Sequence, residues 1–185
     1  SSPEENEEPD VVLVVQHDPT FTLGTGSTKD NLKFALEDAP FEVFRTERGG
    51  EVTYHGPGQI VLYPIINLRR YRKDIHWYLR ALEETVLRTL GKLGLQAERV
   101  KGLTGVWVGG HKVAAVGVRV KRWVTMHGLA LNVDPDLADF DHIVPCGISD
   151  HPVGSLRKLC CAGTDVSMNH VNSLLLESFE EVFGV

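Results

Sequence analysis

Residues 105–133 read GVWVGGHKVAAVGVRVKRWVTMHGLALNV, and this stretch decides the fold. Apolar segments at Gly105–Val108 and Val113–Val120 lie on either side of Gly109-Gly110-His111-Lys112. Adjacent glycines can adopt the positive φ angles that a tight hairpin turn requires. A third segment of the same kind, Trp123–Val133, follows after a short break. The stretch therefore predicts three consecutive strands paired as a meander.

Segments nearer the N-terminus predict further strands. Val11–Gln16, Phe41–Thr46 and Gln59–Ile66 are rich in β-branched and aromatic residues, and glycine and proline lie near their ends. Asp30–Asp38, between the first two of these segments, is expected to form a short helix.

Two longer segments have helical periodicity. The first begins at Asp74, a suitable N-cap, and ends near Gly94. The second begins after Ser167, another suitable N-cap. The apolar residues that recur at helical spacing are Ile75, Tyr78, Leu79, Leu82, Val86, Leu90 and Leu93 in the first segment, and Val171, Leu174, Leu175, Phe179 and Val182 in the second.

Strands interleaved with two main helices indicate an α+β domain, with a mixed or antiparallel sheet and helices on one face. The chain has 185 residues, of which 42% are hydrophobic, and this fits one domain with a sizeable core. We assign this domain to residues 11–185. Residues 1–10 carry five acidic side chains and are expected to form a flexible lead-in.

Charge and cysteine content exclude several classes of protein. The net charge is −6, which disfavours nucleic acid as a partner. The apolar run Val11–Val15 is too short to cross a membrane and lacks the flanks of a signal peptide, so we expect a soluble protein. The three cysteines are odd in number, and Cys160 and Cys161 are adjacent, which argues against a disulfide framework. A reducing compartment and at least one free thiol are expected.

A glycine-rich segment, Arg48–Gln59, has four glycines within twelve residues. Glycine lets the main chain approach a ligand closely. The segment also contains Arg48, Tyr54 and His55, which are not typical of a flexible linker, and it matches no phosphate-binding loop. We therefore interpret it as a binding loop, with an ordinary glycine-rich connection as the alternative.

One cysteine lies where it can act as a nucleophile. Cys146 follows Pro145, which restricts the backbone, and precedes Gly147, which leaves space beside the sulfur. A nearby cation would favour its thiolate, and Lys112 in the glycine-rich turn or a histidine could supply it. Taken alone, Cys146 could equally be a small buried residue and Lys112 a solvated turn residue.

The histidines that could assist Cys146 are His55, His127 and His142, whereas His17, His76 and His170 have no assigned role. The histidines and cysteines do not form ligand pairs of the usual zinc spacings, so no metal site is expected.

Four motifs, taken in order, resemble the lipoyl(octanoyl) transferases: Arg48–Gln59, Gly110–Arg119, Met126–Asn132 and Pro145-Cys146-Gly147. The resemblance runs from about Val11 to the C-terminus and is strongest to the cyanobacterial and plastid branch. It implies the fold of the biotin and lipoate protein ligases, in which a mixed sheet with flanking helices surrounds an acyl tunnel.

The resemblance also implies roles for individual residues. Cys146 would carry the acyl group as a thioester, and Lys112 would activate the thiol and assist proton transfer. The acyl group would be bound by Arg48, Gly49, Gly50, Glu51, Val52, Thr53, Tyr54, His55, Ala115, Val116, Gly117, Gly128, Leu129 and Ala130. Ala115 stands where many relatives have serine, and the strand and helix that usually precede Val11 are not found in this sequence.

The implied reaction moves octanoyl from acyl carrier protein to a lysine of a lipoyl domain, in 2-oxoacid dehydrogenase E2 subunits or glycine cleavage H protein, without ATP or another cofactor. A monomer in the plastid stroma, or otherwise in the cytoplasm, is expected. Because both partners tend to be acidic, Arg69–Lys73 is a candidate docking surface, followed by Arg119, Lys121 and Arg122. A solvated turn before the helix is the simpler explanation of Arg69–Lys73.

Three alternatives remain at this point. An ATP-dependent lipoate protein ligase would share the fold and would not need a cysteine at position 146. A non-catalytic acyl-binding protein would need neither Cys146 nor Lys112. A thiol hydrolase would pair the thiol with a histidine base rather than with a lysine.

Overall fold

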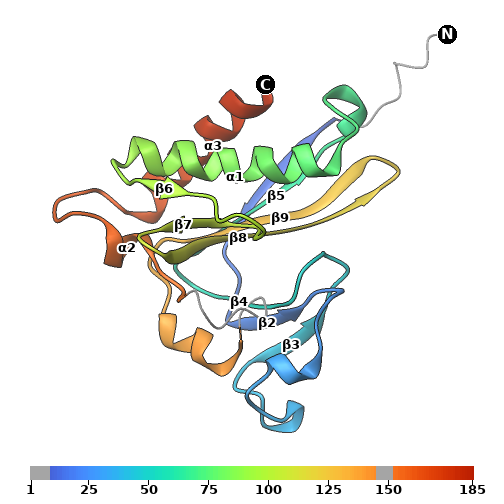
Figure 1. Ribbon diagram of the computed structural model, residues 1–185, viewed down its shortest axis with the longest axis vertical. Coiled ribbons are helices and arrows are strands. Elements are labelled where there is room, and N and C mark those ends of the chain that lie inside the picture. The colour runs from blue at the N-terminus through green and yellow to red at the C-terminus, as the bar shows by residue number, and fades with distance from the viewer. Residues whose placement is uncertain (1–8, 145–151) are drawn as a thin grey trace.

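The computed structural model describes residues 9–144 and 152–185, which form two sheets and two long helices (Figure 1). The six-stranded sheet has the order β1 (Val11–Val15), β5 (Gln59–Ile65), β9 (Val124–Asn132), β8 (His111–Lys121), β7 (Val106–Val108) and β6 (Ala97–Glu98). The three-stranded sheet has the order β3 (Glu42–Arg45), β2 (Thr20–Leu23) and β4 (Val52–His55). The helices are α1 (Ile75–Lys92), α2 (Leu156–Leu159) and α3 (Met168–Phe183), with 3-10 turns η1 (Lys29–Asn31), η2 (Leu36–Asp38), η3 (Leu68–Arg70) and η4 (Leu137–His142).

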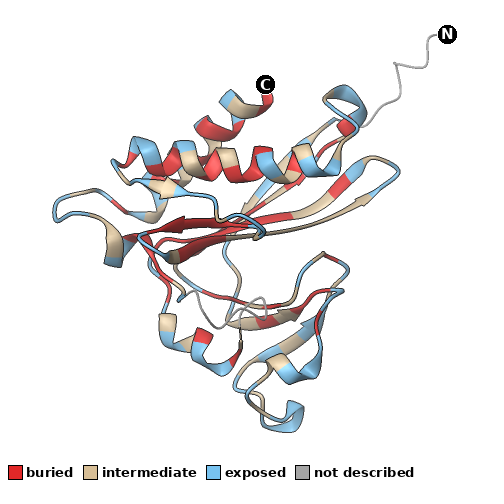
Figure 2. Cartoon of the chain, viewed as in Figure 1, coloured by how far each residue is buried: buried red, intermediate tan, exposed pale blue. Residues whose placement is uncertain are grey.

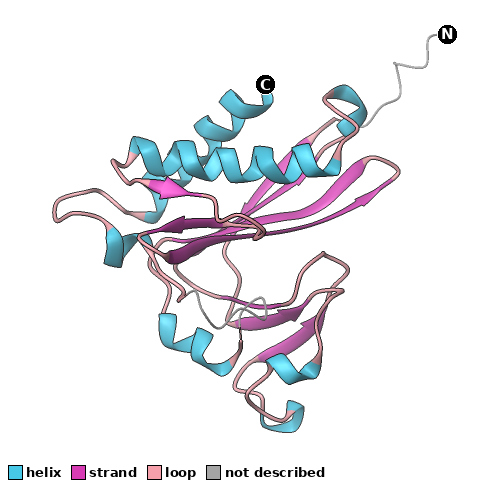
Figure 3. Cartoon of the chain, viewed as in Figure 1, coloured by secondary structure: helices cyan, strands magenta, loops and turns pink. Residues whose placement is uncertain are grey.

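The α+β prediction is confirmed. All strand pairs of the large sheet are antiparallel, whereas β2 pairs parallel with β3 and antiparallel with β4. The mixed pairing therefore belongs to the small sheet. Helices α1 and α3 cover one face of the large sheet, and the small sheet lies on its other side (Figure 3).

The predicted meander forms β7, β8 and β9. Gly109 and Gly110 have φ angles of 54° and 79°, as the hairpin turn between β7 and β8 requires. The turn between β8 and β9 uses the same left-handed region at Arg122 and Trp123, with φ angles of 54° and 71°. These two turns fix the register of the strands, and this register determines which residues of β8 and β9 lie opposite each other in the floor of the site.

The two predicted helices also form. The Asp74 carboxylate accepts a hydrogen bond from the Trp77 N–H at 3.0 Å and so caps α1. Gly94 follows the end of α1 with a φ of 76°. Ser167 precedes α3 as predicted, but its hydroxyl makes no capping hydrogen bond.

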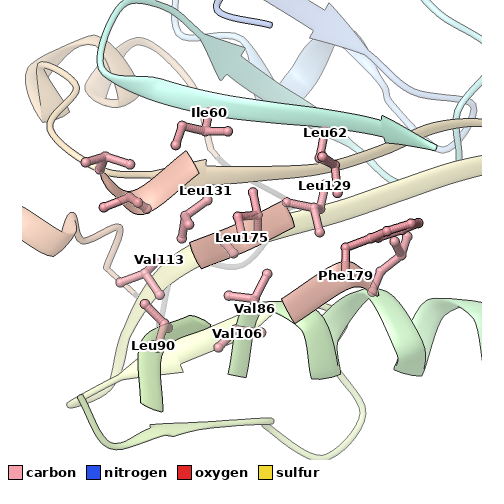
Figure 4. Close-up of a cluster of buried hydrophobic side chains, with 14 of the residues drawn as sticks. Ile60, Leu62, Val86, Leu90, Val106, Val113, Leu129, Leu131, Leu175 and Phe179 are labelled. Carbon is pink, nitrogen blue, oxygen red and sulfur yellow. The ribbon is translucent and has the colours of Figure 1, made fainter. Parts of the chain in front are cut away.

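The main core lies between the large sheet and the two long helices. Side chains of α1 and α3, including Val86, Leu90, Leu175 and Phe179, pack against β5, β8 and β9 (Figure 4). The buried residues follow the inner faces of these elements (Figure 2). A second cluster packs side chains of the small sheet against the region of η4 and contains Phe21, Leu23, Val52, Tyr54, Phe140 and Ile143. Each sheet is therefore supported by its own core.

The structure differs from the sequence predictions in places. Asp30–Asp38 does not form a continuous helix, because Leu32 pairs with Ile143 and the Lys33 N–H donates to the His142 carbonyl at 3.0 Å. These tertiary bonds replace helical ones and leave only η1 and η2. Strand β4 lies inside the segment that we expected to be a loop. Strands β2 and β6 and the short elements α2 and η4 were not predicted.

No helix among the described residues is long and apolar enough to cross a membrane.

Candidate functional site

A cavity of about 340 Å³ lies between the two sheets. Its floor is formed by β5, β8 and β9, and the small sheet and the glycine-rich segment enclose it from the other side. The lining residues are His17, Thr20, Thr22, Phe44, Thr46, Arg48, Gly49, Gly50, Glu51, Val52, Thr53, His55, Val61, Tyr63, Ala115, Val116, Gly117, His127, Gly128, Leu129 and Ala130. This volume falls in the range of about 300–1,000 Å³ that is typical of small-molecule sites.

The floor of the cavity contains two pairs of very small residues on β8 and β9. Ala115 lies opposite Ala130 and Gly117 lies opposite Gly128 on the paired strands β8 and β9. The two pairs are two residues apart, so they form adjacent rows about 7 Å apart along the sheet. Such a floor leaves room for an extended apolar chain to lie against the strands, and each buried methylene would contribute about 0.8 kcal/mol.

The glycine-rich segment closes over this floor. The Gly49 N–H donates to the Val118 carbonyl at 2.9 Å, which attaches the segment to β8. A Cβ atom at Gly117 would lie 2.9 Å from the Gly49 carbonyl oxygen, so only glycine fits here without displacing the segment. The main chains of the segment and of β8 therefore approach each other closely at two glycines.

Arg48 holds the same segment to the small sheet. Its side chain is buried, with 9% exposed. One terminal nitrogen donates to the Thr22 carbonyl and hydroxyl at 2.7 and 2.9 Å, and the other donates to the Gly49 carbonyl at 3.1 Å. These bonds fix a positive charge in the wall of the cavity.

Three histidines share that wall. Burial lowers the pKa of His55 to about 4, and burial also lowers the pKa values of His17 and His127, where the Arg48 charge adds to the effect at His127. His17 Nε2 lies 2.7 Å from the Tyr63 hydroxyl. The lowered pKa values leave the three imidazoles neutral at pH 7.

A run of buried hydrogen bonds connects the cavity to the neighbourhood of Lys112. His55 Nδ1 lies 2.7 Å from Gln59 Oε1, and Gln59 Nε2 donates to Asn132 Oδ1 at 2.9 Å. Asn132 Nδ2 donates in turn to the Gly154 carbonyl at 3.1 Å, and the Gly154 N–H donates to the Lys112 carbonyl at 2.9 Å. The small sheet, the large sheet and the backbone beside Lys112 are thus joined.

Lys112 is buried, with 9% exposed, near the start of β8. Its Nζ lies 5.3 Å from the centroid of the Trp107 ring. Lys112 lines a small cavity of about 20 Å³ that shares Thr53, Ala115 and Ala130 with the large one. The structure therefore brings this predicted residue next to the end of the large cavity.

Most of the predicted substrate-binding residues line the large cavity. Tyr54 is the exception, because the strand alternation of β4 turns its ring into the second core, where burial raises the pKa of its hydroxyl. Cys146 lies outside the described residues. Val144 and Pro152 are the described residues on either side of it, and the Pro152 carbonyl accepts from the Lys112 N–H at 2.8 Å.

The sequence reasoning missed several cavity residues. His17, Thr20 and Thr22 come from the region of β2, which was not predicted, and Tyr63 comes from a strand that was predicted only as a structural element. His142, a proposed helper of Cys146, packs edge-on against Phe21, and its position relative to Cys146 lies outside the described residues. Among residues 9–144 and 152–185, no group of three or more His, Cys, Asp or Glu side chains could hold a metal ion.

The sequence matches the family described as lipoyl protein ligase A/B catalytic domain over residues 2–180. Octanoyltransferases of Nostoc punctiforme and a Synechocystis species are each 54% identical over 176 residues, covering 95% of this chain and 75% and 76% of their own lengths. A chloroplastic octanoyltransferase of Arabidopsis thaliana is 51% identical over 182 residues, covering 94% of this chain and 65% of its own.

Solved structures show the same fold at low sequence identity. Lipoate-protein ligase A bound with ATP matches with a TM-score of 0.78 and 18% identity, covering 96% of this chain and 74% of that chain. Biotin protein ligase from Aquifex aeolicus with biotin and ATP matches with a TM-score of 0.58 and 17% identity, covering 89% and 70%. The family match and the close relatives together show that the chain belongs to the lipoyl protein ligase A/B catalytic domain family and, within it, to the octanoyltransferases, which are acyltransferases.

Proposed function

We propose that this octanoyltransferase takes octanoyl from acyl carrier protein, holds it as a thioester on Cys146, and passes it to a lysine of a lipoyl domain without ATP. The observation that carries the proposal is the cavity floored by Ala115, Ala130, Gly117 and Gly128, whose end lies beside the buried Lys112. Such a cavity can hold an acyl chain, and the amine of Lys112 beside its end can assist the transfer of that chain.

In the first step, the Cys146 thiolate attacks the carbonyl carbon of the octanoyl thioester. The bond to the carrier's thiol breaks, and that thiol leaves as a thiolate that takes up the proton of Lys112. One thioester replaces another, so the step needs no nucleotide. The Lys112 ammonium favours the attacking thiolate by its positive charge.

In the second step, the acceptor lysine attacks the Cys146 thioester as a neutral amine. The new C–N bond forms as the C–S bond breaks, and the free energy of the thioester drives formation of the amide. Lys112, once it has given up its own proton, accepts the proton released by the incoming amine. The same side chain thus assists both halves of a ping-pong reaction.

The octanoyl chain would lie along the floor of the large cavity. Ala115 and Ala130 would face its first carbons, next to Lys112, and Gly117 and Gly128 would lie one row further along. The neutral histidines at the wall add no charge beside the chain. This arrangement would favour a medium-length, unbranched acyl group.

The partners are lipoyl-domain proteins and, we propose, acyl carrier protein. The two predicted basic stretches meet in space, because Asn67 pairs with Val124 and the Leu68 N–H donates to the Trp123 carbonyl at 2.8 Å. Arg69, Arg72, Lys73, Lys121 and Arg122 therefore gather around one end of the large sheet. We call this group the basic end.

Several charges near the basic end are already paired. Arg70 binds Asp10 at 3.0 Å, Arg72 binds Asp74 at 3.3 Å, and Arg119 binds Glu47. Lys121 and Lys112 lie at opposite ends of β8, which corresponds to about 30 Å of strand. A carrier docked at the basic end would have to extend its arm along the sheet face that carries the cavity.

We also propose that the protein acts as a monomer in the plastid stroma. The chloroplastic relative from Arabidopsis supports this compartment. Because other relatives come from cyanobacteria, the bacterial cytoplasm is the alternative compartment.

The proposal is tested by incubating the protein with octanoyl-acyl carrier protein and an apo lipoyl domain, without ATP. Octanoylation of the lipoyl domain is expected, and it should require both Cys146 and Lys112. A strict requirement for ATP would instead support a lipoate protein ligase. Transfer at the wild-type rate by a Cys146→Ser variant would rule out the thioester route.

A further inference from the structure

Glu83 is a fully buried carboxylate on α1, with 0% of its side chain exposed, and the proposed reaction does not use it. Its Oε2 accepts hydrogen bonds from Arg80 Nη1 at 2.6 Å and from Arg99 Nε at 3.0 Å. Its Oε1 accepts from the Gly105 N–H at 2.9 Å. A buried charge is costly unless it is paired, so each oxygen of Glu83 has a defined partner.

The bond to Gly105 leads directly to Lys112. Gly105 has a φ of 140°, and a Cβ atom placed there would lie 2.7 Å from Lys112 Cε and 2.6 Å from the Ala114 carbonyl oxygen. The main chain at Gly105 therefore packs against the stem of Lys112. Two residues further on, the Trp107 ring lies under the Lys112 ammonium at 5.3 Å.

We propose that Glu83 is a positioning residue for Lys112. Glu83 holds the main chain of Gly105 in place, and the aliphatic part of the Lys112 side chain packs against this main chain. Glu83 thereby sets the position of the Lys112 ammonium relative to the end that the two cavities share. The importance of this position for catalysis rests on the proposed function. The packing itself does not, because it follows from the contacts of Glu83, Gly105 and Lys112.

The neighbouring Glu84 provides a matched control. It binds the same Arg99 at 2.9 Å and also Arg88 at 3.3 Å, but its side chain is 37% exposed. No contact between Glu84 and Gly105 is recorded among the described residues. A change at Glu84 therefore disturbs the arginines without disturbing the wall beside Lys112.

Glu83→Gln is the most informative variant, because the amide has a single acceptor oxygen. Charge-assisted bonds are stronger than neutral ones, so this oxygen is expected to stay with Arg80 and Arg99. The amide nitrogen would then face the Gly105 N–H, two donors would meet, and the wall beside Lys112 would shift. Glu83→Ala removes both sets of bonds and should have at least as large an effect.

The experiment measures two quantities in the full chain. The first is the rate at which an amine reagent labels Lys112, determined by competitive labelling and mass spectrometry. The second is the single-turnover rate of acylation by octanoyl-acyl carrier protein, measured with its KM. Glu83→Gln should raise Lys112 labelling several-fold and slow acylation about tenfold, with KM unchanged, because small misplacements of a reacting group are costly. Glu84→Gln should leave both quantities at their wild-type values.

The outcomes separate this inference from the proposed function. Unchanged Lys112 labelling in folded Glu83→Gln protein would overturn the positioning role, whatever happens to acylation. Raised labelling with unchanged acylation would support the positioning role and would remove Lys112 from the proposed reaction. If Glu83→Ala does not fold, Glu83→Gln carries the test, with a cooperative thermal unfolding transition as the check on its fold.

Discussion

A bulky side chain in the cavity floor beside Lys112 should weaken binding of the acyl chain. Ala130 is buried on β9, faces Ala115 across the strand pair, and lines both the large cavity and the small cavity beside Lys112. In Ala130→Leu, an isobutyl group replaces a methyl group at the point where the acyl chain would enter the cavity. The chain would lose contact with the floor or would have to stop short.

The expected magnitude follows from burial. If the leucine displaces about two methylenes of the bound chain, at about 0.8 kcal/mol each, binding loses about 1.6 kcal/mol, or roughly 15-fold. Hexanoyl should lose about as much, because its first carbons would face the same two alanines. The kcat/KM of both donors should therefore fall roughly 15-fold in Ala130→Leu, and their ratio should stay the same.

The assay compares octanoyl and hexanoyl carrier proteins as donors, with wild-type enzyme and Ala130→Leu side by side. Ala35→Leu serves as the control, because Ala35 is exposed and lies outside the cavity lining. An unchanged kcat/KM for both donors in folded Ala130→Leu would show that the acyl chain does not lie on this floor.

Three further predictions concern the cavity wall and the basic end. The His55 pKa is about 4 in the fold against 6.5 when unperturbed, so the unfolded chain binds the proton more readily. The free energy of unfolding therefore has its full value above pH 6.5 and decreases as the pH falls towards 4, by as much as about 3 kcal/mol. In His55→Gln, the free energy of unfolding measured by urea titrations should depend less on pH in this range. Gly117→Ala places a methyl group 2.9 Å from the Gly49 carbonyl oxygen and should raise the KM for octanoyl donors and lower stability by about 1–3 kcal/mol; unchanged values of both would show that the segment adapts freely. Arg72→Glu combined with Lys121→Glu should raise the KM for octanoyl-acyl carrier protein and weaken its dependence on salt, while leaving octanoyl-pantetheine turnover unchanged; an unaffected KM would remove the basic end as a docking surface.

The large sheet, apart from β6, could be predicted because its strands and turns are encoded locally. The glycine pair at Gly109-Gly110 and the apolar runs on either side of it are sufficient to predict β7 and β8. The helix after Asp74 has a cap, a periodic apolar face and a terminating glycine. In these elements the local preferences and the tertiary structure agree.

The small sheet could not be predicted in the same way. Strand β2 has only four residues and pairs in parallel with β3, which lies about twenty residues further along the chain. Asp30–Asp38 has residues compatible with a helix, but its hydrogen bonds go to the distant segment around His142 and Ile143. Such pairings depend on contacts that no short window of sequence contains.

The candidate site could be predicted only in part, because some of its residues belong to local sequence motifs and others do not. Lys112, the alanine pair and the glycine pair of the floor belong to motifs, and the sequence analysis named them. His17 has no motif and reaches the cavity only because the chain leads from β1 into β2. Tyr54 does not line the cavity, because its segment forms a strand whose alternation turns its side chain into the second core, and the sequence analysis treated this segment as a loop.

The intact mass of the enzyme after incubation with octanoyl-acyl carrier protein alone tests the thioester on Cys146. Without ATP and without an acceptor, we expect one octanoyl adduct on Cys146, which neutral hydroxylamine removes and which an apo lipoyl domain discharges. Cys146→Ser should carry no such thioester. An unchanged mass, with Cys146 shown to be reduced and the protein folded, would contradict the proposed thioester mechanism.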